Sequence, residues 1–173
     1  MTLLLVATTS AWAYGFEVRD AGTRLVRGVY FLDATIEYEF TKPPIEALNS
    51  GVPLTIIMEM EVVRRHEWMW DESVADLQQR FRLEYHALAE QYVVVNLNNG
   101  AFTSFPTLSA ATGYLGGIRD FPLLDGSLVA SGDQYYGRMR VSLDLEALPA
   151  PLRLVAYLTK RWRLASEWYQ WPL

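Results

Sequence analysis

The 173-residue sequence contains no cysteine, and this absence removes several classes of site at once. Disulfide bonds, thiolate nucleophiles, iron–sulfur clusters and cysteine-based zinc sites all require the thiol group. Only two histidines are present, His66 and His86. They fall in opposite registers of neighbouring predicted strands, so their rings are expected to face opposite ways, whereas a metal ion needs converging ligands. We therefore predict no metal site and no cofactor.

Positive charge is also scarce: 15 Lys and Arg stand against 20 Asp and Glu, which gives a formal net charge of −5. Because nucleic-acid binders contact phosphates with clustered cations, a nucleic-acid partner is not expected.

No segment reaches the ~18 uninterrupted apolar residues of a membrane helix. The Gly-x-Ser-x-Gly elbow and the glycine spacings of nucleotide-binding loops are missing too. The sequence predicts a protein without catalytic activity.

The first thirteen residues, MTLLLVATTSAWA, resemble the end of a secretory signal peptide. Leu3 to Val6 form an apolar run, and Ala11-Trp12-Ala13 is an A-x-A cleavage pattern. No Lys or Arg precedes the apolar run, which is expected if the native start lies upstream of Met1. The alternative is an ordinary first strand. We predict a protein that is exported to the periplasm and cleaved after Ala13.

The longest alternating stretch spans residues 53–70, PLTIIMEMEVVRRHEWMW. Its first register is mostly apolar and comprises Leu54, Ile56, Met58, Met60, Val62, His66, Trp68 and Trp70. Its second register is mostly polar and comprises Thr55, Glu59, Glu61, Arg65 and Glu67. Period two predicts a half-buried strand. A straight strand would span about 50–60 Å, so we expect a bend or bulge near Arg64 and Arg65.

The remaining chain reads as shorter elements around this strand. Further strands are predicted at residues 16–20, 24–40, 77–87, 92–97, 121–124, 136–145 and 162–171. Turns are predicted at Ala21-Gly22, at 88–91 and at Asn98-Asn99-Gly100. Short helices are predicted at 44–49, at 107–115 with Thr107 as the cap, and at 152–158.

About six to eight strands in hairpin order, with two or three short helices in the connections, predict an antiparallel β-sandwich, immunoglobulin-like or similar. Residues 14–173 are expected to form a single β-rich domain. The polar faces carry opposite charges that could pair between strands. The acidic residues are Glu37, Glu39, Glu59 and Glu61, and the basic residues are Arg80, Arg82, Arg138 and Arg140.

An ordered set of short motifs runs along the chain: LNSGVPL (48–54), RRHEWMW (64–70), RLEYHAL (82–88) with Tyr92 downstream, Leu143-Asp144, LPAPLR (148–153), Trp162 and SEW (166–168). In this order the sequence resembles the domain-of-unknown-function 4390 family of exported proteobacterial proteins. The resemblance implies a mostly β protein of unassigned activity and supplies no catalytic residues. Family members are often encoded beside a membrane sensor kinase, which suggests such a kinase, or another envelope protein, as the partner.

The segment 64–70 has the most unusual local composition in the chain. Because arginine and tryptophan are enriched in binding hot spots, the segment is a candidate recognition surface. The candidate binding residues are Arg64, Arg65, Trp68, Trp70 and Trp168. The alternative is structural: Trp68 and Trp70 would end the core face, and the arginines would lie across its rim with packed stems and solvated heads.

Three functions remain open from the sequence. The first is an exported binding or accessory module that modulates an envelope sensor-kinase system, and it predicts an exposed aromatic patch or a groove between sheets. The second is a small outer-membrane β-barrel, favoured by the chain length and by the alternation of Tyr169, Trp171 and Leu173. The third is an enzyme with an unrecognised site. The binding module accounts for most of the features above.

Overall fold

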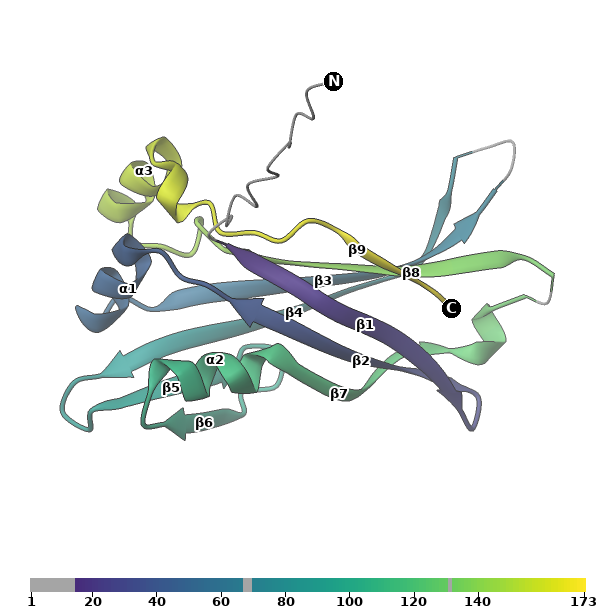
Figure 1. Cartoon of the computed structure of the whole chain (residues 1–173), viewed down its shortest axis with the longest axis horizontal. Coiled ribbons are helices and arrows are strands. Elements are labelled where there is room, and N and C mark those ends of the chain that lie inside the picture. The colour runs from purple at the N-terminus through teal and green to yellow at the C-terminus, as the bar shows by residue number, and fades with distance from the viewer. Residues whose placement is uncertain (1–14, 67–69, 131) are drawn as a thin grey trace, which may run out of the picture.

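The computed structural model describes residues 15–66, 70–130 and 132–173, and these residues form mostly antiparallel β-structure (Figure 1). The predicted signal peptide and its cleavage after Ala13 therefore lie outside the described residues, as does Trp68. Two sheets stack with a shared core between them, so the predicted antiparallel sandwich is confirmed in an open form.

The larger sheet has β3 (Leu54–Arg65) at its centre. Its strand order is β6-β5-β4-β3-β8-β9, and every neighbouring pair is antiparallel. The other strands are β4 (Glu72–His86), β5 (Gln91–Asn96), β6 (Phe102–Phe105), β8 (Gln134–Leu143) and β9 (Tyr169–Pro172). The strand predicted from the longest alternation is thus the one with long partners on both sides.

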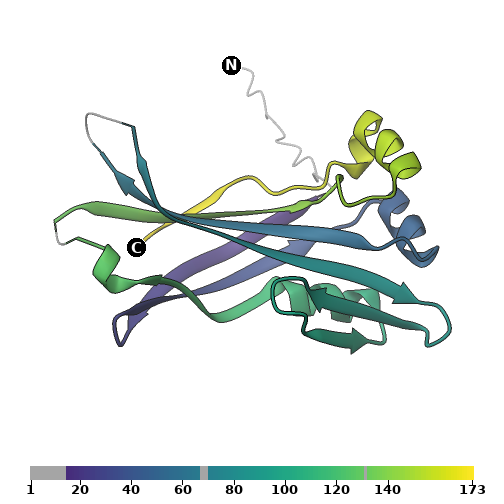
Figure 2. The same cartoon turned by 180° about the vertical axis from the view of Figure 1, so that it is seen from behind.

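The smaller sheet has the order β1-β2-β7 and lies across one face of the larger sheet (Figures 1 and 2). Its strands are β1 (Phe16–Val26), β2 (Val29–Tyr38) and β7 (Gly117–Asp125). It faces the apolar register of β3, where Ile56, Met58, Met60 and Val62 are at most 2% exposed. Complete burial of such a side chain stabilises the fold by about 1.5–3 kcal/mol.

Three short helices lie in the connections of the described chain, as predicted: α1 (Lys42–Asn49), α2 (Leu108–Gly116) and α3 (Ala150–Leu158). Prolines in the first turn favour the starts of α1 and α3. The N–H groups of a first turn have no acceptor within the helix, so proline loses no hydrogen bond there. The predicted cap of α2 is confirmed, since the Thr107 hydroxyl accepts a hydrogen bond from the Ala110 N–H at 3.1 Å. No described helix is long and apolar enough to cross a membrane.

The predicted turn at Ala21-Gly22 and the single strand over 24–40 are wrong. Ala21 and Gly22 lie inside β1, and the chain reverses at Arg27 and Gly28. Both turn residues adopt the left-handed region, with φ of 50° and 82°. Glycine adopts this conformation freely, whereas arginine does so only under local constraint. Gly28 is therefore the residue by which the sequence signals this turn.

The predicted closing strand over 162–171 is also largely wrong. Residues Lys160–Trp162 form a 3₁₀ turn, η2, and only Tyr169–Pro172 pair with β8 as a strand. Between them a single bridge joins Ser142 to Ala165. Pro172 has no N–H for a ladder, which suits it to the edge position of β9. The short edge strand β6 was not predicted at all.

Packing of β9 onto β8 depends on Gly137. A Cβ atom at this position would overlap the indole ring of Trp171, which lies opposite Gly137 in register and is 5% exposed. Absence of the side chain lets the indole lie directly on the strand backbone, which anchors the C-terminal edge of the larger sheet.

We expect Gly137→Ala to lower the free energy of unfolding by about 1–3 kcal/mol, because the added methyl group overpacks the site. The matched control is Gly22→Ala, where nothing lies within 4 Å of the added Cβ, and it should change stability by no more than about 0.5 kcal/mol. Urea denaturation measures both values. Equal stability of the two variants would contradict the packing described.

Candidate binding face

The β3–β4 hairpin extends past the smaller sheet as an arm (Figure 1, upper right), formed by the described residues 63–66 and 70–75. The β3–β4 register shifts between Val62 and Val63, close to the predicted bend. Trp70 lies on this arm and is 95% exposed. The expectation that Trp70 ends the core face is therefore wrong. The β1–β2 hairpin and the arm diverge at this end of the molecule, so the smaller sheet does not cover the tip of the arm (Figures 1 and 2).

Arg64 and Arg65 point to opposite faces of the larger sheet, as neighbours in a strand must. The Arg64 guanidinium forms ion pairs with Glu72 across the hairpin and with Asp133 at 3.4 Å. The hydrogen bond from Arg64 lowers the pKa of the Glu72 carboxyl below its usual value of 4.5. Arg64 therefore links the arm to the residue just before β8, and its charge is already paired.

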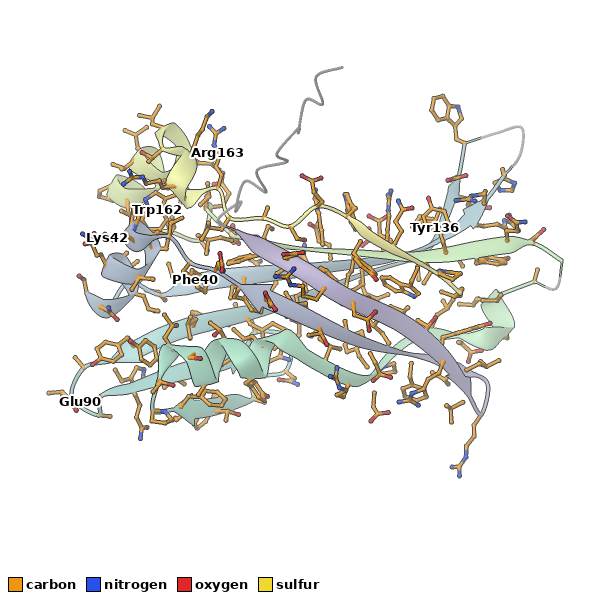
Figure 3. The ribbon with its side chains drawn as sticks, in the orientation of Figure 1. Phe40, Lys42, Glu90, Tyr136, Trp162 and Arg163 are labelled. Carbon is orange, nitrogen blue, oxygen red and sulfur yellow. The ribbon has the colours of Figure 1, made fainter. Side chains whose placement is uncertain are left out.

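Arg65 lies on the outer face, away from the smaller sheet. Its guanidinium carbon is 5.4 Å from the ring centroid of Tyr136, a cation–π contact. The Tyr136 hydroxyl donates a hydrogen bond to Asp71 at 3.0 Å, which ties the arm to β8. Burial and this carboxylate raise the Tyr136 pKa. Tyr136 lies beneath the arm on the right of Figure 3.

A hollow of about 430 Å³ opens on the outer face between the arm and β8. It is lined by Glu61, Val63, Trp70, Asp71, Ser73, Tyr136 and Arg138. Beside it, a second hollow of about 560 Å³ runs from Arg65 along β8 to the C-terminal residues 170–173. Trp70 and Arg65 thus each border a concave surface, a shape that suits an inserted side chain of a partner.

A ladder of ion pairs continues this face toward the middle of the sheet. Arg138 donates to Glu61 at 2.6 Å, and Arg140 contacts Glu59 through two hydrogen bonds of 2.5 and 3.1 Å. The indole of Trp168 covers both guanidinium groups. The central guanidinium carbon of each arginine lies 4.7 Å from the centroid of the indole ring. These two cross-strand pairs confirm the predicted pairing of the polar faces.

The other predicted pairings of the polar faces differ. Arg80 pairs with Asp144 at 2.5 Å, and Arg82 pairs with Glu84 on its own strand. Glu37 lies in the smaller sheet and pairs with Arg19. The sequence supplies the charges and the alternation, but it does not specify which strands share a sheet.

The two histidines lie beside different carboxylates at separate places. The His66 ring is 3.6 Å from Glu72, and the His86 ring is 3.0 Å from Glu84. Within residues 15–66, 70–130 and 132–173, no three potential metal ligands of the His, Asp and Glu type converge.

Of the five candidate binding residues, Arg65, Trp70 and Trp168 share the outer face. Arg64 lies on the opposite face, and Trp68 lies outside the described residues. The sequence reasoning missed Tyr136 and Asp71, although Tyr136 shares the register of Arg138 and Arg140. That register could have placed its ring beside Arg65 once β8 was paired with β3.

The molecule is a two-sheet β protein that carries an uncovered aromatic arm and an Arg–Trp outer face. The family model named "Domain of unknown function (DUF4390)" matches residues 13–172, and the chain belongs to this family. No curated protein and no solved structure matches the chain.

Two tryptophans of this face should respond differently to removal. Trp168→Ala uncovers two guanidinium groups and should lower the free energy of unfolding by about 1–2 kcal/mol. Trp70→Ala removes a side chain that is 95% exposed and should change stability by no more than about 0.5 kcal/mol. Chemical denaturation of both variants measures the difference. A larger effect at Trp70 than at Trp168 would contradict these assignments.

The Arg64–Glu72 pair also predicts a pH effect. Because the folded-state pKa of Glu72 lies below 4.5, its contribution to stability is present above that pH and is lost as the pH falls through the folded pKa. Carboxyl NMR titration should show a low pKa for Glu72 that rises in Arg64→Ala. A Glu72 pKa that is unchanged by this substitution would show that Arg64 does not hold the carboxylate.

Proposed function

We propose that the protein is an exported binding module that recognises another envelope protein through the arm and the outer face of β3 and β8. The observation that carries this proposal is Trp70, which is 95% exposed on an arm whose base is fixed by specific polar contacts. Because the base of the arm is already ordered, the entropic cost of binding is reduced. An exposed tryptophan on such a support is well placed to serve as an anchor.

The chemistry of the face favours a protein partner. Trp70, Tyr136 and Arg65 are of the three residue types most enriched in binding hot spots. Glu61 and Asp71 line the same hollow, so the face carries both signs of charge and suits a partner with mixed polarity. The proposed role is recognition and not catalysis.

Two further features support export and a signalling role. The family match begins at residue 13, next to the predicted cleavage after Ala13, so nearly all of the predicted signal peptide lies outside the family model. The implied gene neighbourhood of the family favours a membrane sensor kinase as the envelope protein that the arm contacts. We therefore propose a periplasmic accessory subunit of such a kinase.

Site-specific photocrosslinking tests the binding face. A photoreactive phenylalanine analogue at position 70 should form an adduct with one envelope protein in cells, whereas the same analogue at Phe102 should not. Phe102 is a matched control because it is an exposed aromatic residue, 72% accessible, on the edge strand β6. Trp70→Ala together with Arg65→Ala should abolish co-purification of that protein. Identical adducts at both positions, or none, would refute the proposed face.

Export has its own test. Mass spectrometry of the protein recovered from the periplasm should show Tyr14 as the first residue. Ala13→Arg, which removes the small residue at the cleavage position, should leave the leader attached. Recovery of the uncleaved wild-type chain from the cytoplasm would overturn the proposed export and would leave the protein-binding test unaffected.

A further inference from the structure

Helix α3 presents an apolar face that the rest of the described chain leaves uncovered. Leu154, Val155 and Leu158 are 66%, 51% and 79% exposed. Leu158 follows Val155 by three residues and Leu154 by four, so the three side chains lie on one side of the helix. Ala156, on the opposite face, is fully buried against the core. The helix is therefore fixed by one face and offers the other to the surroundings.

A group of cations lies at the end of α3 and in the segment that follows it. Residues 147–166 contain Arg153, Lys160, Arg161 and Arg163 and no acidic residue, although the whole chain has a net charge of −5. Of these cations, Arg153 is paired with Glu146 at 3.4 Å, so the cationic character rests on Lys160, Arg161 and Arg163. Lys42 lies beside them at the start of α1; Lys42, Trp162 and Arg163 gather at the left-hand end in Figure 3. Within the described residues, Lys160, Arg161 and Arg163 have no carboxylate within ion-pair distance.

A hollow of about 470 Å³ lies next to the helix and combines both features. Phe40 and Leu164 give it an apolar floor, and Lys160 and Arg161 give it a cationic rim. Lys42 lies on the same rim, where it also pairs with Glu46 at 3.4 Å. The Thr41 hydroxyl donates a hydrogen bond to the Arg161 carbonyl, which joins α1 to the segment after α3. Trp162, 3% exposed, anchors that segment in the core.

We propose that this surface, which we call the α3 end, docks the protein onto an anionic lipid bilayer. Leucine and valine side chains enter the boundary between headgroups and acyl chains, while lysine and arginine contact lipid phosphates. Charge complementarity selects the occupant: a cationic rim on an acidic protein matches an anionic membrane surface. The α3 end and the arm lie at opposite ends of the molecule, so docking at the α3 end leaves the arm at the end far from the bilayer (Figure 1).

Vesicle co-sedimentation of the purified protein, in the processed form that the cell produces, tests the proposal. Mixed phosphatidylcholine–phosphatidylglycerol vesicles should bind the protein, pure phosphatidylcholine vesicles should bind it weakly, and added salt should weaken binding. Leu154→Glu/Leu158→Glu should reduce the affinity about tenfold or more. Lys160→Ala/Arg161→Ala, which keeps the apolar face, should reduce it about tenfold and flatten the salt dependence.

The matched control is Leu25→Glu/Leu128→Glu. It adds the same two charges at leucines that are 56% and 55% exposed. Leu25 lies near the end of β1 and Leu128 just after β7, both remote from α3 in the chain fold (Figure 1), so this variant should bind anionic vesicles like the wild type. Circular dichroism verifies that each variant is folded. No binding to anionic vesicles, or equal loss in the control, would overturn the proposal. Capture of a protein that is sensitive to Leu154→Glu/Leu158→Glu, without vesicle binding, would overturn it in favour of a protein contact.

Discussion

Burial of one face of β3 between the two sheets is the interaction on which the rest of the structure depends. The strand pairs with β4 on one side and β8 on the other, and its inward residues meet the smaller sheet. Its outward residues Glu59 and Glu61 meanwhile fix the register of β8 through two arginines. A slip of one residue would bury these carboxylates and expose Met58 and Met60, so register and core are specified together.

The two sheets differ in extent, and this difference creates the functional surfaces. The smaller sheet covers the middle of β3 and diverges from the end of the β3–β4 hairpin, which leaves the tip of the arm and Trp70 uncovered (Figure 1). The opposite end is closed by connections: α1, α3 and η2 lie there, where they cap the core with Ala156 and Trp162 and turn apolar and cationic side chains outward. The core thus positions an aromatic arm at one end and the α3 end at the other.

The sequence predicts well those features that depend on period two. Alternation locates β3, β4 and β8, and opposite charges at matching positions anticipate the Glu59–Arg140 and Glu61–Arg138 pairs. Prediction is poor where the decisive fact is tertiary. Arg27 adopts a left-handed conformation that only its hairpin imposes, and residues 163–168 alternate in sequence while pairing at a single bridge. Trp70 shares the register of a buried strand, and only the limited reach of the smaller sheet reveals that it is exposed.

Native-state hydrogen exchange measured residue by residue is the most direct test that β3 organises the fold. Because β3 is hydrogen-bonded on both sides and buried, the amides from Ile56 to Val62 should exchange only through global unfolding, and they should be the slowest in the chain. Amides of the arm beyond Arg65 should exchange orders of magnitude faster. If the amides of β1 and β2 outlast those of β3, the smaller sheet would be the stable unit, and the central role given to β3 would be wrong.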